Sequence, residues 1–155
     1  MSLASHRARR LGTSLFEVLM TLAIVALLAG IAVPRFGRLS DRACVDAAAR
    51  RLMHELGSIR DRAVMTGKPA TVVFELNGGT VEVKGLAGAG TSWSSGTFDL
   101  EASPYRVTFK EVGFDDETVM FDGYGLANDT GKLVLKRGDH ERAILLERSG
   151  VARWN

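Results

Sequence analysis

The sequence is poor in the side chains that build disulfides and metal centres. It contains one cysteine, Cys44, in 155 residues, which excludes a disulfide within the chain and a site with several cysteine ligands. Its three histidines, His6, His54 and His140, are scattered, and none has a cysteine or carboxylate at metal-ligand spacing on the same predicted element. We therefore expect no metal and no cofactor, and we interpret Cys44 as a small apolar side chain on a helix face.

The sequence also lacks the patterns of common active sites. It has no G-x-S-x-G nucleophile motif and no carboxylate pair that can be assigned to a cleft. The Gly/Ser-rich stretch GLAGAGTSWSSG, residues 85–96, lacks the spacing of a phosphate-binding loop. We interpret it as a flexible surface loop, in which Trp93 either contacts a partner or folds back onto the sheet. We predict that the chain is not an enzyme.

A run of three acids, Asp115, Asp116 and Glu117, raises the question of calcium. Calcium takes about six to eight oxygen ligands in a set geometry. Consecutive side chains point in different directions, so this run predicts a solvated turn rather than a calcium site.

The sequence carries little net charge of either sign. The formal net charge is +2. Residues 1–12 carry three arginines and no acid, and without them 17 basic side chains face 18 acidic ones. The sequence pI of about 8.9 therefore gives only weak support to a nucleic-acid partner, which requires a basic patch on the folded part.

What the chain does have is one long apolar run near its start. From Val18 to Val33, the only polar side chain is that of Thr21. Residues 13–33 would form a helix of about 32 Å, which matches a hydrocarbon core of about 30 Å. We predict a single membrane-spanning segment at residues 13–35, although small residues near its end also allow a cleaved signal peptide. The arginines before the segment favour a cytoplasmic N-terminus.

Glu17 is the anomaly in this apolar run. A carboxylate at the centre of a membrane helix costs about 2.5–3.5 kcal/mol and needs a partner. The next cation along the chain is Arg35, at the far end of the run. Cleavage after Gly12 would give Thr13 a free, positively charged α-amino group. Thr13 and Glu17 are four residues apart and share one helix face, and the amine can also reach the Glu of a neighbouring copy.

The stretch RRLGTSLFEVLMTLAIVALLAGIAVPRF resembles the N-terminal signal of type IV pilins and type II secretion pseudopilins. The resemblance implies that a prepilin peptidase cleaves between Gly12 and Thr13 and that Thr13 is N-methylated. Counted from Thr13, Glu17 is the fifth residue and Pro34 the twenty-second, as in that family. It also implies that Glu17 pairs with the N-terminal amine of an adjacent subunit during assembly. The first mature residue is usually Phe in the family, whereas this chain has Thr13.

Pro34 has two interpretations from its own chemistry. Inside a helix it removes a backbone donor and crowds the carbonyl of Gly30, so it predicts a bend at the exit from the membrane. Alternatively, it only ends the span. The resemblance assigns it, with Glu17, to subunit assembly.

The remaining sequence predicts an α+β fold. A helix is expected to continue to about residue 66, because the apolar residues that follow Pro34 recur at steps of four and three: Val45, Ala49, Leu52, Leu56, Ile59 and Ala63. This stripe favours packing on a sheet over a coiled-coil seam, and Thr66-Gly67-Lys68-Pro69 predicts the helix end. Beyond it, TVVFEL-NGG-TVEVK predicts a hairpin, and YRVTFKEV, TVMF, KLVLKR, RAILLER and VARW predict further strands.

Residues 121–154, FDGYGLANDTGKLVLKRGDHERAILLERSGVARW, are called the C-terminal stretch here. This stretch resembles the GspH/FimT branch of minor pilins and pseudopilins. It has Ser149-Gly150, but Val151 stands where that branch favours Arg. The resemblance implies a basic leader (1–12), a transmembrane and assembly helix (13–35) and a periplasmic pilin-like domain (36–155). It also implies a single-pass inner-membrane protein of a filament. Its partners would be other pilins or pseudopilins, the prepilin peptidase, an inner-membrane assembly platform and the lipid bilayer.

Three functions remain open from the sequence. The first is a minor pseudopilin of a type II secretion pseudopilus that takes part in protein export. The second is a type IV pilus minor pilin that binds DNA for natural transformation, in which Arg148 and Arg153 would contact DNA and Lys132, Lys136, Arg137 and Arg142 lie on nearby strands. The third is a membrane-anchored domain with an unrelated role.

Overall fold

The structure is a computed structural model that describes residues 14–85 and 96–154, with side chains except at positions 31–38. The chain divides into two compact units, Met1–Gly37 and Arg38–Asn155, which are described separately below. The predictions made for Gly12, Thr13, Trp93 and most of the 85–96 loop lie outside the described residues.

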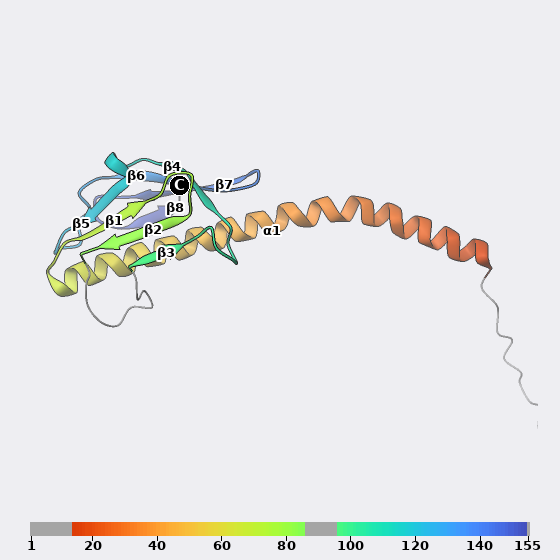
Figure 1. Cartoon of the computed structure of the whole chain (residues 1–155), viewed down its shortest axis with the longest axis horizontal. Helices are drawn as coiled ribbons and strands as arrows, with labels where there is room; N and C mark the ends of the chain where they lie inside the picture. The colour runs from red at the N-terminus through yellow and green to blue at the C-terminus, as the bar shows by residue number, and fades with distance from the viewer. Residues whose placement is uncertain (1–13, 86–95, 155) are drawn as a thin grey trace, which may run out of the picture. The chain divides into compact units, whose positions relative to one another are not determined.

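In the described residues, one helix is followed by eight strands, which Figure 1 labels. Helix α1 spans Leu15–Thr66, so its backbone is helical through Pro34. The predicted bend at Pro34 stays a prediction. The strands are β1 (Ala70–Phe74), β2 (Thr80–Lys84), β3 (Thr97–Asp99), β4 (Thr108–Val112), β5 (Thr118–Phe121), β6 (Gly131–Arg137), β7 (His140–Leu146) and β8 (Ala152–Trp154), with the 3₁₀ turn η1 (Asp115–Glu117) before β5.

The strands form two antiparallel sheets. Sheet A has the order β3-β2-β1-β5, and sheet B has the order β4-β6-β7-β8. Where β1 ends, Leu76 forms a parallel bridge with Phe109 of β4, which joins the two sheets. The predicted hairpin is confirmed as β1–β2, with Asn77 at φ 63° in its turn. Strand β3 was not predicted, because its three residues directly follow the Gly/Ser-rich stretch.

The core of the unit Arg38–Asn155 lies where the second part of α1 packs against the sheets. All six residues of the predicted apolar stripe are buried, which confirms core packing. They form one cluster with residues from both sheets, among them Phe74, Phe109, Phe121, Leu133 and Ile144. The helix ends as predicted: Gly67 adopts φ 63°, a left-handed conformation that glycine reaches without steric cost. Cys44 is half-buried, and its Sγ lies 3.8 Å from the carbonyl oxygen of Pro104.

Candidate functional site

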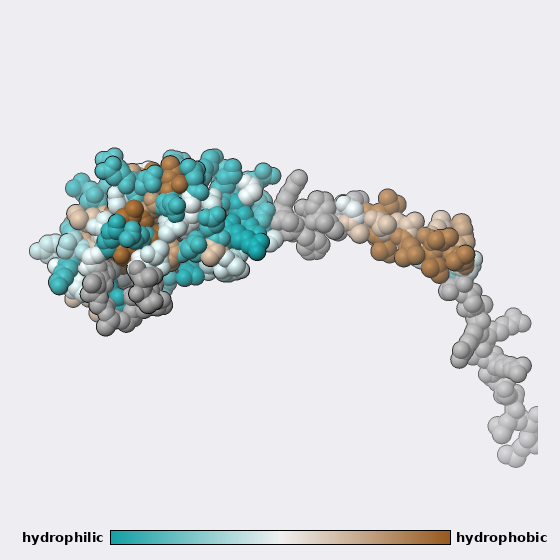
Figure 2. Space-filling view, in the orientation of Figure 1, coloured by the Kyte–Doolittle hydropathy of each residue, from teal (hydrophilic) through white to brown (hydrophobic). Residues whose placement is uncertain are grey.

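The first candidate is the apolar part of α1 in the unit Met1–Gly37. Every residue from Leu15 to Gly30 is exposed, and the large side chains include Phe16 at 70%, Leu27 at 72% and Leu28 at 63%. Figure 2 shows this part of the helix as a continuous apolar surface. Contiguous exposed apolar surface of this extent marks contact with a membrane or a partner.

Glu17 is the single charged residue within the described stretch 14–30, and it is exposed in the first turn of α1. Its predicted partner, the amine of Thr13, and the predicted cleavage after Gly12 lie outside the described residues, as does the side chain of Pro34. The predicted span 13–35 therefore begins one residue before the described part of the chain, and for its last five residues only the backbone is described. Among the described residues, no helix combines the length and the hydropathy needed to cross a membrane.

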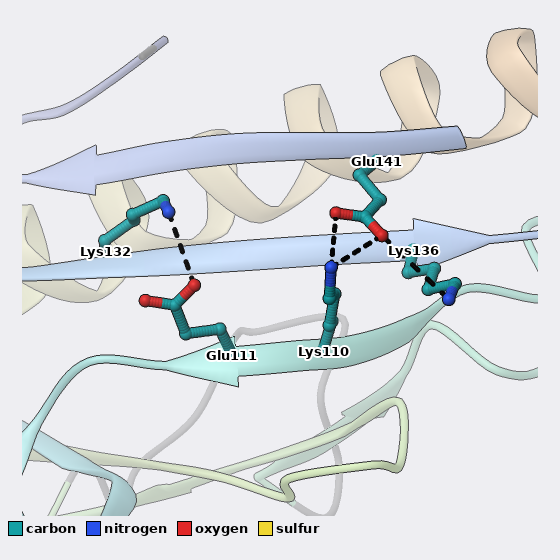
Figure 3. A network of polar contacts seen from close by, with 5 residues as sticks. All are labelled: Lys110, Glu111, Lys132, Lys136 and Glu141. Carbon is teal, nitrogen blue, oxygen red and sulfur yellow. Dashed lines mark hydrogen bonds and ion pairs between the residues drawn. The ribbon is translucent and has the colours of Figure 1, made fainter. Parts of the chain in front are cut away.

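The second candidate is the surface of sheet B, where the basic residues of the C-terminal stretch lie. On its outer face, Lys110 of β4 donates to both carboxylate oxygens of Glu141 at 2.8 Å. Lys136 lies 3.9 Å from the same carboxylate, and Lys132 pairs with Glu111 at 3.3 Å. Figure 3 shows these five side chains projecting from the strands β4, β6 and β7. The hydrogen bond from Lys110 is the main cause of the lowered pKa of Glu141.

A β-bulge produces this arrangement. Phe109 pairs with Leu135 and Glu111 with the adjacent Val134, so Lys110 is the extra residue of β4. As a result, two consecutive side chains, Lys110 and Glu111, are exposed. Lys110 reaches across β6 to Glu141 of β7, and Glu111 pairs with Lys132 of the neighbouring strand β6. The outer face is therefore a set of paired charges rather than a basic patch.

On the inner face of sheet B, two arginines tie the β6–β7 hairpin to α1. The Nε of Arg137 donates to Asp41 at 2.8 Å, and the Nε of Arg142 donates to Asp46 at 2.6 Å. The hydrogen bond from Arg142 lowers the pKa of Asp46 below its ordinary value, and the same bond raises the pKa of Arg142. The Arg142 guanidinium also lies 5.6 Å from the centre of the Trp154 ring. These contacts hold the hairpin on the helix.

The two arginines named as DNA contacts occupy different settings. Arg153 of β8 pairs with Glu147 at 3.3 Å. Arg148 is exposed, and among the described residues its side chain has no ion pair. Because the other basic residues of the C-terminal stretch also have acidic partners, the structure does not gather them into a patch of free positive charge.

A shallow polar cleft of about 200 Å³ lies between α1 and the start of β7. Arg42, Val45, Asp46, His140, Glu141 and Arg142 line it. The Nε2 atom of His140 is buried and, within the described part of the chain, has no hydrogen-bond partner. In the same residues no group of three His, Cys, Asp or Glu side chains is placed to hold a metal ion.

Sequence reasoning missed a third feature, the loop between β5 and residue 127. Its tip, Tyr124, is 88% exposed, and the loop is closed by hydrogen bonds from the backbone N–H groups of Tyr124 and Leu126 to Asp122 Oδ1 at 2.9 and 2.8 Å. The signal in the sequence was Asp122-Gly123 followed by Gly125, which is typical of a turn. That the turn would present an aromatic side chain beside the end of α1 depends on tertiary packing.

No family model and no curated protein matches the sequence, whereas solved structures match the fold. The type IV minor pilin FimU of Pseudomonas aeruginosa superposes with a TM-score of 0.55 at 16% identity, over 76% of this chain and 92% of FimU. The minor pseudopilin EpsH from the type 2 secretion system of Vibrio cholerae superposes with a TM-score of 0.54 at 12% identity, over 72% of this chain and 95% of EpsH. At these identities the likeness shows the fold, and it confirms the predicted pilin-like α+β architecture.

Proposed function

We propose that this chain is a minor pseudopilin, a structural subunit of a type II secretion pseudopilus that takes part in protein export. The observation that carries the proposal is a pairing of two parts in one chain. An apolar helix segment, exposed from Leu15 to Gly30 and charged only at Glu17, continues into a domain with the fold of EpsH and FimU. A subunit that is stored in a membrane and then built into a filament needs both parts.

In this proposal, residues 1–12 are a cytoplasmic leader that the prepilin peptidase removes after Gly12. Residues 13–35 then anchor the chain in the inner membrane, and residues 36–155 form the periplasmic domain. Thr13 becomes the methylated N-terminus. Its amine neutralises Glu17 of an adjacent subunit, which lowers the cost of a carboxylate in lipid and favours docking. Pro34 allows the helix to bend where it leaves the bilayer.

The decisive experiment is co-expression of the full chain with a prepilin peptidase, followed by intact-mass measurement. We expect a shortened chain that begins at Thr13, with an additional mass of one methyl group. A Gly12→Ala variant serves as the matched control and should remain at full length. An unshortened wild-type chain, or an N-terminus at another residue, would contradict the proposal.

Glu17 gives a second, independent test. We expect Glu17→Ala to be processed normally but to enter filaments at least about tenfold less efficiently, because the stabilising ion pair is lost. Thr21→Ala changes a polar side chain one turn further along the same segment and is the control. If both variants assembled like the wild type, the chain would behave as a membrane-anchored domain with an unrelated role.

A second candidate is a type IV pilus minor pilin that binds DNA, and FimU, which shares the fold, is a type IV minor pilin. Exposed Arg148, without an ion pair among the described residues, is the observation that favours it, whereas Arg153 is partly neutralised by Glu147. Contacts to phosphates make binding strongly salt-dependent. A gel shift with duplex DNA at low salt tests it, with Arg148→Ala as the variant. Absence of binding by the wild-type chain removes this candidate.

A further inference from the structure

An apolar patch projects from the folded unit where α1 ends. Val64, Met65, Tyr124 and Leu126 are 48%, 86%, 88% and 49% exposed, and we call these four residues the Tyr124 patch. The patch is continuous, because Gly125 packs on the helix so tightly that a Cβ there would lie 2.8 Å from Cγ2 of Val64. Exposed apolar groups gathered in this way mark an interaction surface.

The Tyr124 patch is held in place before any partner arrives. Besides the two bonds to the Asp122 carboxylate, the N–H of Gly125 donates to the Asp122 carbonyl at 3.0 Å, and the N–H of Asp122 donates to the Leu126 carbonyl at 2.9 Å. The loop therefore loses little conformational freedom on binding. Tyrosine is also among the residues that dominate binding energy at interfaces.

Two exposed basic residues, Lys68 and Arg148, flank the Tyr124 patch. Lys68 follows Gly67, and Gly67 packs against the loop: its carbonyl oxygen would lie 2.8 Å from a Cβ added at Gly123. The backbone N–H of Ala127 donates to the carbonyl oxygen of Arg148 at 3.0 Å, which places Arg148 next to the end of the loop. Both side chains are exposed, and neither forms an ion pair with a described residue. A partner surface for this patch would thus combine an apolar group with negative charge.

The other end of sheet A carries that combination. Because neighbouring strands are antiparallel, the ends of β1 and β3 and the start of β5 lie at the same end of sheet A, opposite the end where β1 begins. Six acids gather there, which we call the acidic edge: Glu75, Asp99, Glu101, Asp115, Asp116 and Glu117. Five of them are exposed and Glu117 is half-buried, and none pairs with a described base.

The acidic edge also has an apolar centre and little opposing charge. Leu76 is 40% exposed, and its backbone N–H donates to Glu117 Oε2 at 3.3 Å, so it lies beside the acids. Arg106, in the loop that follows Glu101, is a basic residue near this edge. Because none of the six carboxylates forms an ion pair with a described base, their negative charge stays available to a partner.

We propose that a second copy of this chain docks its acidic edge on the Tyr124 patch, with Leu76 against Tyr124 and the carboxylates facing Lys68 and Arg148. The two surfaces lie at opposite ends of sheet A, so the contact is heterologous, and each copy keeps one free surface for the next. Contacts of this kind build open filaments when the rotation between successive copies does not close into a ring. The inference deepens the proposed function and rests on it for its setting.

Disulfide trapping between full-length chains in membranes tests the contact. In a Cys44→Ala background, one tagged chain carries Met65→Cys at the Tyr124 patch, and a differently tagged chain carries Asp116→Cys at the acidic edge. We expect an oxidant to give a mixed dimer only when both chains are present. A chain that carries both cysteines should give a ladder of dimers, trimers and longer products.

Charge reversal separates a specific contact from random collision. Lys68→Glu with Arg148→Glu in the Met65→Cys chain should lower the mixed dimer at least about fivefold, because attraction becomes repulsion at each position. Glu75→Lys with Asp115→Lys in the other chain should restore it. Arg50→Glu, at an exposed helix position, is the matched control and should leave the yield unchanged. Tyr124→Ala should lower the yield without any change of charge.

A mixed dimer no more abundant than the homodimer of Met65→Cys chains would overturn the proposal, and so would unchanged yield in the reversed-charge pair. Trapping of Met65→Cys only on a different protein, or a gel shift with duplex DNA that Lys68→Glu and Arg148→Glu abolish without any mixed dimer, would assign the surface to another occupant. Processing at Gly12 is measured separately by mass. A processed chain without the mixed dimer refutes this contact alone, whereas a mixed dimer between unprocessed chains refutes the proposed processing alone.

Discussion

Residues 15–30 and residues 38–66 are both helical and rich in apolar side chains, but they place those side chains differently. From Leu15 to Gly30 every residue is exposed. Between Val45 and Ala63 one stripe of apolar residues is buried, and charged side chains lie on the other faces of the helix. A helix that is apolar on all faces needs an apolar environment around it, whereas an amphipathic helix needs only one sheet surface. The apolar side chains of the first region are thus open to contact with a partner or with lipid, whereas the stripe of the second region packs within its own domain.

Truncation of a leucine in each region should break this comparison most sharply. Leu56→Ala removes a fully buried side chain and should lower the free energy of unfolding by about 3 kcal/mol. Leu27→Ala, at a position 72% exposed, should leave it unchanged. The described buried core begins at Val45, so Leu27 lies outside it. Urea denaturation followed by circular dichroism measures the free energy of unfolding of both variants. Equal effects at the two positions would contradict the division into a packed and an unpacked region.

Glycines give the next largest contrast. Gly150 adopts φ 73°, and a Cβ there would lie 2.3 Å from the carbonyl oxygen of Gly125 and 2.7 Å from Cδ of Arg60. Gly150→Ala should therefore destabilise the domain by about 2 kcal/mol. The matched control is Gly57→Ala, at a helical position where an added Cβ meets nothing within 4 Å. It should stabilise the helix by about 0.5–1 kcal/mol. The same urea denaturation series measures both, and the sign of the change in the free energy of unfolding distinguishes them.

The attachment of the β6–β7 hairpin to α1 predicts a pH dependence. The pKa of Asp46 is lowered from its ordinary value of 3.8 by the hydrogen bond from Arg142. This bond therefore stabilises the folded state in full at pH values above 3.8. That contribution, about 0.5–1 kcal/mol for a half-buried pair, is lost as the pH falls through the lowered pKa. Asp46→Asn should remove this part of the acid dependence of the unfolding free energy.

A double-mutant cycle serves as its control. Arg142→Met should have the same effect on the acid dependence as Asp46→Asn, and the double variant should add no further loss, because both remove one interaction. Additive losses would show that each residue acts through other contacts.

The smallest effect is expected on the outer face of sheet B. Lys110→Met removes an exposed ion pair with Glu141, and exposed pairs contribute little to stability. The urea midpoint in 1 M salt, where such pairs are screened, should equal that of the wild type within error. A clear loss at high salt would indicate that the paired charges on this face hold the sheet together.

The sequence predicted the fold class well because its patterns are local. The steps of four and three from Val45 to Ala63 predicted a helix with one buried face, and Gly67 with Pro69 predicted where it ends. Seven of the eight strands overlap segments that alternate or cluster apolar residues. The division of the strands into two sheets was not predictable, because the Leu76–Phe109 bridge joins residues far apart in the chain.

The sequence by itself determined that one apolar segment carries a single acid, Glu17, because hydrophobicity and charge belong to the residues themselves. No packing among the described residues covers this segment. It also determined the buried stripe, which follows from the period of the α-helix. Only the tertiary structure decided that the basic residues of the C-terminal stretch are paired with acids. It alone placed Tyr124 and the acidic edge at opposite ends of sheet A, because charge pairing and strand order depend on contacts between residues distant in sequence.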